Sequence, residues 1–243
     1  MKTHSSRWHF KAGVVSFAAS LLFIIPGVSL ADSIDWTVVG GGSVSFAGGS
    51  APLKGTGITV SGVSDADTSA TINILHGILT FTTGNLTGSN TTQWFFGANS
   101  SPTAITITGC IDADADGGAC DAADTPVSLQ GKITDAAVSK ATPGASFATV
   151  LFDLSDVINS PSVCAALSAP AGSCGPGTGG GNMLLQVAAG AIPPGGFSAI
   201  RALSGDVFSG PSVPEPTTLL FAAFSVLGVA WLARRRNLGS AAI

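Results

Sequence analysis

The sequence contains no tyrosine and a single glutamate, and only 10% of its 243 residues are charged. Basic residues are especially scarce between residues 32 and 213. That segment holds thirteen aspartates, for a net charge of −9, and only four basic residues, Lys54, Lys132, Lys140 and Arg201. A nucleic-acid partner requires a basic face, and so does an anionic membrane surface. The segment therefore predicts neither nucleic-acid binding nor adsorption to anionic lipid.

Groups for acid–base and nucleophilic chemistry are also scarce. His76 is the only histidine between residues 32 and 213, so a Ser-His-Asp or Cys-His site would have to include it. It lies between Leu75 and Gly77, where two strand candidates meet, which is typical of a turn or strand-end histidine. No HExxH motif is present, and the glycine clusters lack the lysine of a phosphate-binding loop. We therefore expect no catalytic residues and no enzyme activity.

The N-terminus has the three parts of a secretory signal peptide. Residues 1–11 carry two lysines and an arginine, and residues 12–25 are an apolar run too short to favour spanning a bilayer. Ser29 and Ala31 are small residues at the −3 and −1 positions of a cleavage site. We predict that residues 1–31 are removed by a cut before Asp32, the alternative being an uncleaved membrane anchor.

The C-terminus combines an extended motif, an apolar run and a basic cluster. Prolines fix φ and donate no backbone hydrogen bond, so the motif is expected to be extended and accessible. Residues 217–233 carry no charge and would form a helix of about 26 Å, at the short end of what spans a bilayer. A cluster of arginines is expected to stay on the cytoplasmic side. The motif is Val213, Pro214, Glu215 and Pro216, the run is Leu219 to Ala233, and the cluster is Arg234, Arg235 and Arg236.

This order of parts resembles the PEP-CTERM sorting signal of Gram-negative bacteria that make exopolysaccharide. The resemblance covers only the last part of the chain, from the Pro214–Pro216 motif onward. It implies recognition by a membrane-embedded exosortase, cleavage near the motif, and transfer to the cell surface or extracellular matrix. Exopolysaccharide is then an expected partner, and the membrane is contacted only through the helix before processing. The alternative is an ordinary C-terminal anchor with an accidental proline pair.

Between the two signals, short runs with period-two alternation are separated by glycines, with no helical period. We predict an all-β ectodomain over residues 32–212, an antiparallel β-sandwich or jelly roll, followed by the sorting signal over residues 213–243. A β-solenoid is the competing architecture, but no repeat of fixed length is present. One helical turn is predicted at 153–158, a flexible loop at 175–181 and a tether at 205–212. The strand candidates are 36–39, 43–46, 57–60, 71–74, 77–82, 93–96, 103–108, 127–134, 147–152, 183–188 and 197–203.

The four cysteines all lie in the exported segment, where an oxidising environment favours disulfides over free buried thiols. Four cysteines allow three connectivities. We favour Cys110 with Cys120 and Cys164 with Cys174, because each pair closes a short loop of residues that suit turns. 

One constellation has the composition of a metal site. Asp112, Asp114 and Asp116 alternate ahead of a glycine, and Asp121 and Asp124 follow. Carboxylates in this pattern can converge on calcium, which takes six to eight oxygen ligands. The pattern resembles the first half of an EF-hand calcium loop but lacks the glutamate at the twelfth position, and its flanks are strand-like. We predict a weak calcium site of Asp112, Asp114, Asp116 and Asp121; the alternative is a solvated acidic turn closed by a disulfide.

Together these features predict a non-enzymatic exported protein that is structural or adhesive at the cell surface, in an exopolysaccharide or biofilm setting. The alternative function is a secreted carbohydrate-active protein, either a binding module or a glycoside hydrolase. Paired aspartates would suit a hydrolase. However, the segment has only two tryptophans, Trp36 and Trp94, on which a sugar could stack.

Overall fold

The structure is a computed structural model that describes residues 33–210, except 67, 114–117, 170–173 and 189. This part of the chain contains ten strands and one short helix, and every strand pairing is antiparallel. The predicted all-β antiparallel class is therefore confirmed. The elements are β1 (Ile34–Gly40), β2 (Ser43–Phe46), β3 (Pro52–Asp65), β4 (Thr71–Ser89), β5 (Gln93–Phe96), β6 (Ile105–Ile111), β7 (Thr125–Lys140), β8 (Phe147–Asn159), α2 (Pro161–Leu167), β9 (Gly177–Val187) and β10 (Phe197–Gly210).

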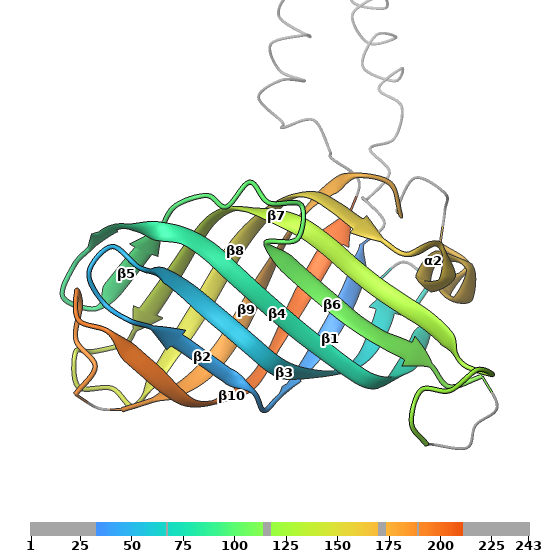
Figure 1. The fold of residues 1–243 in the computed structure, drawn as a ribbon, viewed down its shortest axis with the longest axis horizontal. Helices are drawn as coiled ribbons and strands as arrows, with labels where there is room; N and C mark the ends of the chain where they lie inside the picture. The colour runs from blue at the N-terminus through green and yellow to red at the C-terminus, as the bar shows by residue number, and fades with distance from the viewer. Residues whose placement is uncertain (1–32, 67, 114–117, 170–173, 189, 211–243) are drawn as a thin grey trace, which may run out of the picture.

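The strands form one continuous sheet that closes on itself. Hydrogen bonds run from β1 through β3, β4, β6, β7, β8, β9 and β10, and β10 pairs again with β1. The short strands β2 and β5 lie between β3 and β10 and between β4 and β7. Figure 1 shows the resulting two layers, with β3, β4 and β6 crossing in front of β8, β9 and β1. Each described strand has a neighbour on both sides, so these strands offer no free edge to another chain.

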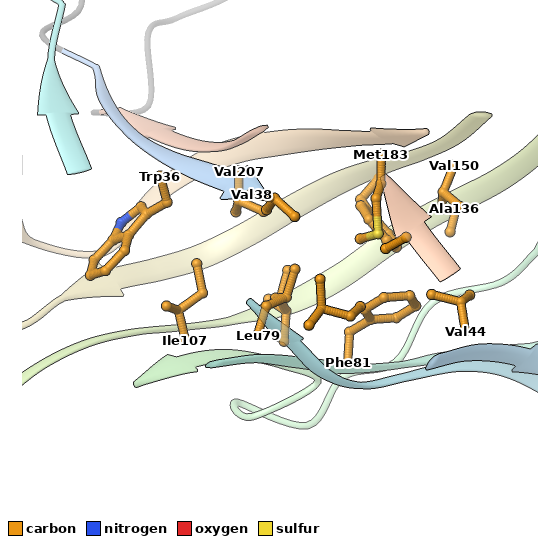
Figure 2. Close-up of a cluster of buried hydrophobic side chains, with 14 of the residues drawn as sticks. Trp36, Val38, Val44, Leu79, Phe81, Ile107, Ala136, Val150, Met183 and Val207 are labelled. Carbon is orange, nitrogen blue, oxygen red and sulfur yellow. The ribbon is translucent and has the colours of Figure 1, made fainter. Parts of the chain in front are cut away.

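The core fills the space between the two layers. Because side chains alternate along a strand, every second residue points inward, and most of the inward positions are apolar. Edge-to-face aromatic pairs cross the core, including Phe81 with Phe152 at a centroid distance of 4.7 Å. Figure 2 shows residues of β1, β7, β8, β9 and β10 facing residues of β2, β4 and β6: Trp36, Val38, Ala136, Val150, Met183 and Val207 on one side, and Val44, Leu79, Phe81 and Ile107 on the other.

A buried polar chain joins three of the strands at one end of the core. The indole Nε1 of Trp36 donates to Asn159 Oδ1 at 3.0 Å, and Asn159 Nδ2 donates to Ser209 Oγ at 2.6 Å. All three side chains are at most 2% exposed. Polar atoms at this depth are costly unless they are paired, so the chain requires all of its members.

The sheet has two ends. We call the end at which the described chain starts and stops the tether end, and the opposite end the far end. Ser33 and Gly210 lie at the tether end, where β3 is followed by β4, β6 by β7, and β8 by α2 and β9. Loops 47–51, 90–92, 141–146 and 188–196 lie at the far end. There Lys140 Nζ and Trp94 Nε1 donate to the backbone oxygens of Ala191 and Gly195, at 2.7 and 3.0 Å.

Helix α2 differs from the predicted helical turn at 153–158, which was wrong. Residues 153–158 belong to β8, where Asp156 has φ of 50° at a bulge. The helix begins two residues after this strand, with Pro161 at its start. Proline at the first helical position was a usable signal. The helix buries Val163 and Leu167 against the core and so closes its tether end.

Two predictions for glycine-rich segments were also wrong. The loop predicted at 175–181 is mostly strand, because β9 begins at Gly177, and the tether predicted at 205–212 continues β10 as far as Gly210. The glycines of β9 do not make this segment a loop; they allow neighbouring atoms to approach the strand closely. A Cβ on Gly180 would lie 2.8 Å from Phe208 Cζ, so the ring of Phe208 occupies the space of the missing side chain.

Candidate functional site

The two ends of the described chain leave the sheet side by side. Ile34 is directly opposite Ser209, and Gly210 is opposite Thr178, so the end of β10 is held between β1 and β9. The motif beginning at Val213 starts three residues after Gly210, a span of at most about 10 Å. The motif residues Val213, Pro214, Glu215 and Pro216 and the arginines Arg234, Arg235 and Arg236 lie outside the described residues.

None of the helices in residues 33–210 combines the length and the apolar character needed to cross a membrane. The apolar helix expected at Leu219 to Ala233 lies outside the described residues, as does the signal peptide at 1–31.

Both predicted disulfides are present at the tether end. Cys110 is bonded to Cys120 with a Cα–Cα distance of 5.9 Å, and Cys164 to Cys174 with 6.3 Å. The first bond anchors the Asp-rich loop to β6, and the second joins α2 to the segment that precedes β9. Each closes a short loop, which stabilises a fold by about 2–3 kcal/mol in the chain-entropy model. 

The Asp-rich loop 112–124 is organised by one buried carboxylate. Asp124 is 7% exposed, and its two oxygens accept the backbone N–H groups of Ala113 and Asp121, each at 3.1 Å. The exposed Asp121 accepts the backbone N–H of Ala123 at 2.7 Å. Asp112 lies on the β6 side of the loop, whereas Asp114 and Asp116 lie outside the described residues. Asp124 is thus committed to the loop backbone, which leaves Asp121 as the better of the two late ligands.

A second group of side chains forms a line across the outer face of the sheet. Asp35 of β1 is opposite Phe208 of β10, which is opposite Gly180 of β9; Gly180 is opposite Asp153 of β8, which is opposite Asp135 of β7. We call these five residues the transverse row. Phe208 is 45% exposed, and Asp135 and Asp153 are exposed beside it. The row therefore presents an aromatic ring with a carboxylate on either side.

The comparisons with known proteins address the C-terminal segment. A family model described as the PEP-CTERM protein-sorting motif matches residues 212–236. This segment is a PEP-CTERM sorting signal. No curated protein and no solved structure matches the chain. The family of the ectodomain is therefore not assigned by these comparisons.

The PEP-CTERM signal makes this an exported protein that passes through a membrane-anchored intermediate and is processed by an exosortase in a Gram-negative bacterium. The signal begins two residues after Gly210, so it continues from the tether end of the described domain.

The calcium site stays a prediction for this PEP-CTERM protein. With millimolar calcium, the thermal unfolding temperature should rise relative to chelator, and Asp114→Ala or Asp116→Ala should abolish the rise. Extracellular calcium modules work at about 10⁻⁴ to 10⁻³ M, and calcium at ten times that dissociation constant stabilises by about 1.4 kcal/mol. Asp156→Ala, outside the loop, is the control. Equal unfolding temperatures in the two buffers would show that the loop is only a solvated acidic turn.

The carboxyl of Asp35 titrates at a higher pH than an ordinary aspartate. Burial raises the pKa of its carboxyl above the ordinary 3.8, and the nearby charge of Asp206 raises it further. Asp35 Oδ1 is buried and has no hydrogen-bond partner among the described residues. A raised pKa means that the folded protein loses stability as pH rises from 3.8 through the folded pKa.

Asp35→Asn should therefore stabilise the protein at neutral pH, because the amide carries no charge that burial would desolvate or that Asp206 would repel; the gain should be at most about 1 kcal/mol. Chemical denaturation at several pH values measures the gain. Well below pH 3.8 the carboxyl is protonated in both states. The gain should then vanish, which provides an internal control. A gain that does not change with pH would contradict this explanation.

The sequence predicted that individual members of the transverse row point outward, but it did not predict that they lie in one line. Asp35 lies between Ile34 and Trp36, and Asp153 between Phe152 and Leu154, so alternation predicts that both carboxylates point outward. Their meeting in one line depends on the strand order and register, which alternation does not specify.

Proposed function

We propose that this PEP-CTERM protein is a non-enzymatic structural or adhesive component of the cell surface or exopolysaccharide matrix. One observation carries the proposal: a closed, disulfide-clamped sheet has its chain ends at one end, directly joined to the sorting signal. Such a domain is delivered with its broad faces directed outward. The two disulfides suit persistence in an oxidising extracellular environment.

The sheet supports a role in which faces, rather than edges, make contacts. Adhesion by strand addition needs an exposed edge, and each described strand already has two partners. Large apolar side chains are instead exposed on the outer faces, including Phe147, Leu151 and Phe208 at 45–52%. Exposed apolar groups in a soluble domain are a feature of interaction surfaces when they gather.

The test compares the wild type with a chain lacking residues 212–236, in the producing bacterium. Cell fractionation should find the wild type in the surface or matrix fraction and the truncated chain in the periplasm or medium. Loss of the gene should reduce matrix cohesion or surface attachment, and wild-type expression should restore it. Normal cohesion and attachment without the protein would contradict the structural or adhesive role.

A secreted carbohydrate-binding module is the second candidate function, and the transverse row favours it. An exposed ring flanked by carboxylates offers a flat apolar platform with hydrogen-bond acceptors at its sides. Asn182, the exposed neighbour of Asp206 across the β9–β10 pairing, adds two donors and an acceptor. Binding of this kind would also account for retention in a polysaccharide matrix.

A further inference from the structure

We propose that the transverse row binds a polysaccharide whose sugars carry free amino groups. This inference rests on the proposed function at the surface or matrix and adds the chemical class of its partner. The row crosses five adjacent strands, which at about 4.8 Å per strand extends for roughly 19 Å. A linear chain of several sugars can lie along such a line and contact each of its parts.

The centre of the row is the aromatic ring of Phe208, which packs over a glycine of the neighbouring strand. The ring of Phe208 lies over Gly180, and a side chain at 180 would displace it. With 45% of the residue exposed, the ring offers an apolar surface to the flat face of a sugar. The face of an aromatic ring also attracts a positive charge placed over it.

One end of the row is hollowed between two carboxylates. Asp135 and Asp153, directly opposite each other, border a depression of about 180 Å³. Ala136, Ala137, Leu151 and Phe152 complete its lining. Like charges that face each other across a sheet destabilise it, and an ammonium group between them would remove this repulsion. The volume of this depression suits a small cationic group on a larger ligand.

The negative charge of this face determines which class of polysaccharide can bind. Asp206 lies next to the row, diagonal to Asp35, and adds to its three carboxylates. The charge of Lys132 on β7 is compensated by Asp156, because Lys132 Nζ lies 2.6 Å from Asp156 Oδ2. An acidic polysaccharide would be repelled, whereas one bearing amines is complementary.

The geometry favours a polysaccharide over a basic peptide. Peptides are recognised by strand addition or in grooves that receive a helix or alternate side chains. The described strands have no free edge, and the depression of about 180 Å³ is smaller than the roughly 300–1,000 Å³ of a typical ligand pocket. A row of surface carboxylates around one ring instead matches a ligand with regularly repeated amines, hydroxyls and flat faces.

The test is calorimetric titration of the mature exported protein with oligosaccharides long enough to span the row. A glucosamine oligomer, at a pH that keeps its amines charged, should bind about tenfold more tightly than the N-acetylglucosamine oligomer. A galacturonate oligomer should not bind. Equal affinity for the two amino-sugar oligomers, or binding of the galacturonate oligomer, would overturn the proposal. So would an equally tight lysine oligopeptide, because the site would then be only electrostatic.

Two variant pairs locate the site. Phe208→Ala should weaken glucosamine-oligomer binding about tenfold, whereas Phe147→Ala, equally exposed on β8 but outside the row, should not. Asp153→Asn should weaken it similarly, whereas Asp121→Asn, which removes an exposed carboxylate of the Asp-rich loop outside the row, should not. Equal losses within either pair would show that the row is not the site. Failure of binding with retention in the matrix intact would reject this inference alone and leave the proposed function standing.

Discussion

Replacing Arg234, Arg235 and Arg236 with serine should leave most of the protein as an unprocessed precursor. The arginines directly follow the apolar run Leu219 to Ala233, and a basic cluster beside a membrane-spanning segment keeps that end in the cytoplasm. Without the cluster, the segment would lose the orientation that presents the motif to the exosortase. Immunoblotting of whole cells should show a larger species that retains the tail.

Arg201→Ser is the matched control, since it removes one arginine from the ectodomain and leaves the sorting signal intact. Arg201 is exposed and its guanidinium contacts only the side chain of Gln186 among the bonds described, so the fold should tolerate the change. Normal processing of the triple serine variant would show that the arginines do not direct sorting.

Trp36→Ala should lower the free energy of unfolding by about 3–5 kcal/mol, the range for removing a large buried aromatic side chain. Trp36 is fully buried between the layers, and its substitution also leaves Asn159 without its indole donor. Since domains of this size are stable by about 5–15 kcal/mol, much of the stability would be lost. Urea denaturation followed by circular dichroism measures the change.

Two further variants divide this effect. Trp36→Phe retains an aromatic ring but leaves Asn159 Oδ1 without its donor, which should account for about 1–3 kcal/mol of the loss. Val39→Ala changes an apolar residue of the same strand that is 50% exposed, and should alter stability by less than about 0.5 kcal/mol. If Trp36→Ala cost no more than Val39→Ala, the packing described for the core would be wrong.

Alternation predicted the all-β class because it reports only on which face of a strand is buried. The cleanest case is β6, where Ile105 and Ile107 were expected on one face and are both fully buried. The short predicted runs were fragments of longer strands. Residues 71–74 and 77–82, for example, belong to β4, which continues through a bulge at His76 with φ of 49°. A bulge interrupts the alternation without ending the strand, so it appears in the sequence as a boundary.

The glycine-rich segments could not be assigned from the sequence because the reason for each glycine lies elsewhere in the chain. Gly179 to Gly181 were predicted as part of a flexible loop, yet a Cβ at Gly180 would lie 2.8 Å from the ring of Phe208, which is distant in sequence. The closure of the sheet through the β1–β10 pairing is also a long-range property. Local patterns do not encode which strand lies beside which.

The candidate sites differ in the same respect: some are made of residues close in sequence and others of residues far apart. The cysteine pairs could be predicted because both partners lie close in sequence, and the sorting signal because its parts are contiguous. The transverse row joins residues from position 35 to position 208 and becomes visible only in the register. The role of Asp124 was missed for a related reason: its hydrogen bonds to the loop backbone depend on how the loop folds.

We infer that the protein is exported and processed at both ends. Mass spectrometry of the protein recovered from the cell surface or matrix tests this directly. We predict a mature chain that begins at Asp32 and ends near Pro214 to Pro216. Peptides from the apolar segment Leu219 to Ala233 should be absent from that fraction and present only in membrane-bound precursor. A surface protein that still carries Leu219 to Ala233 would contradict exosortase processing and favour a plain C-terminal anchor.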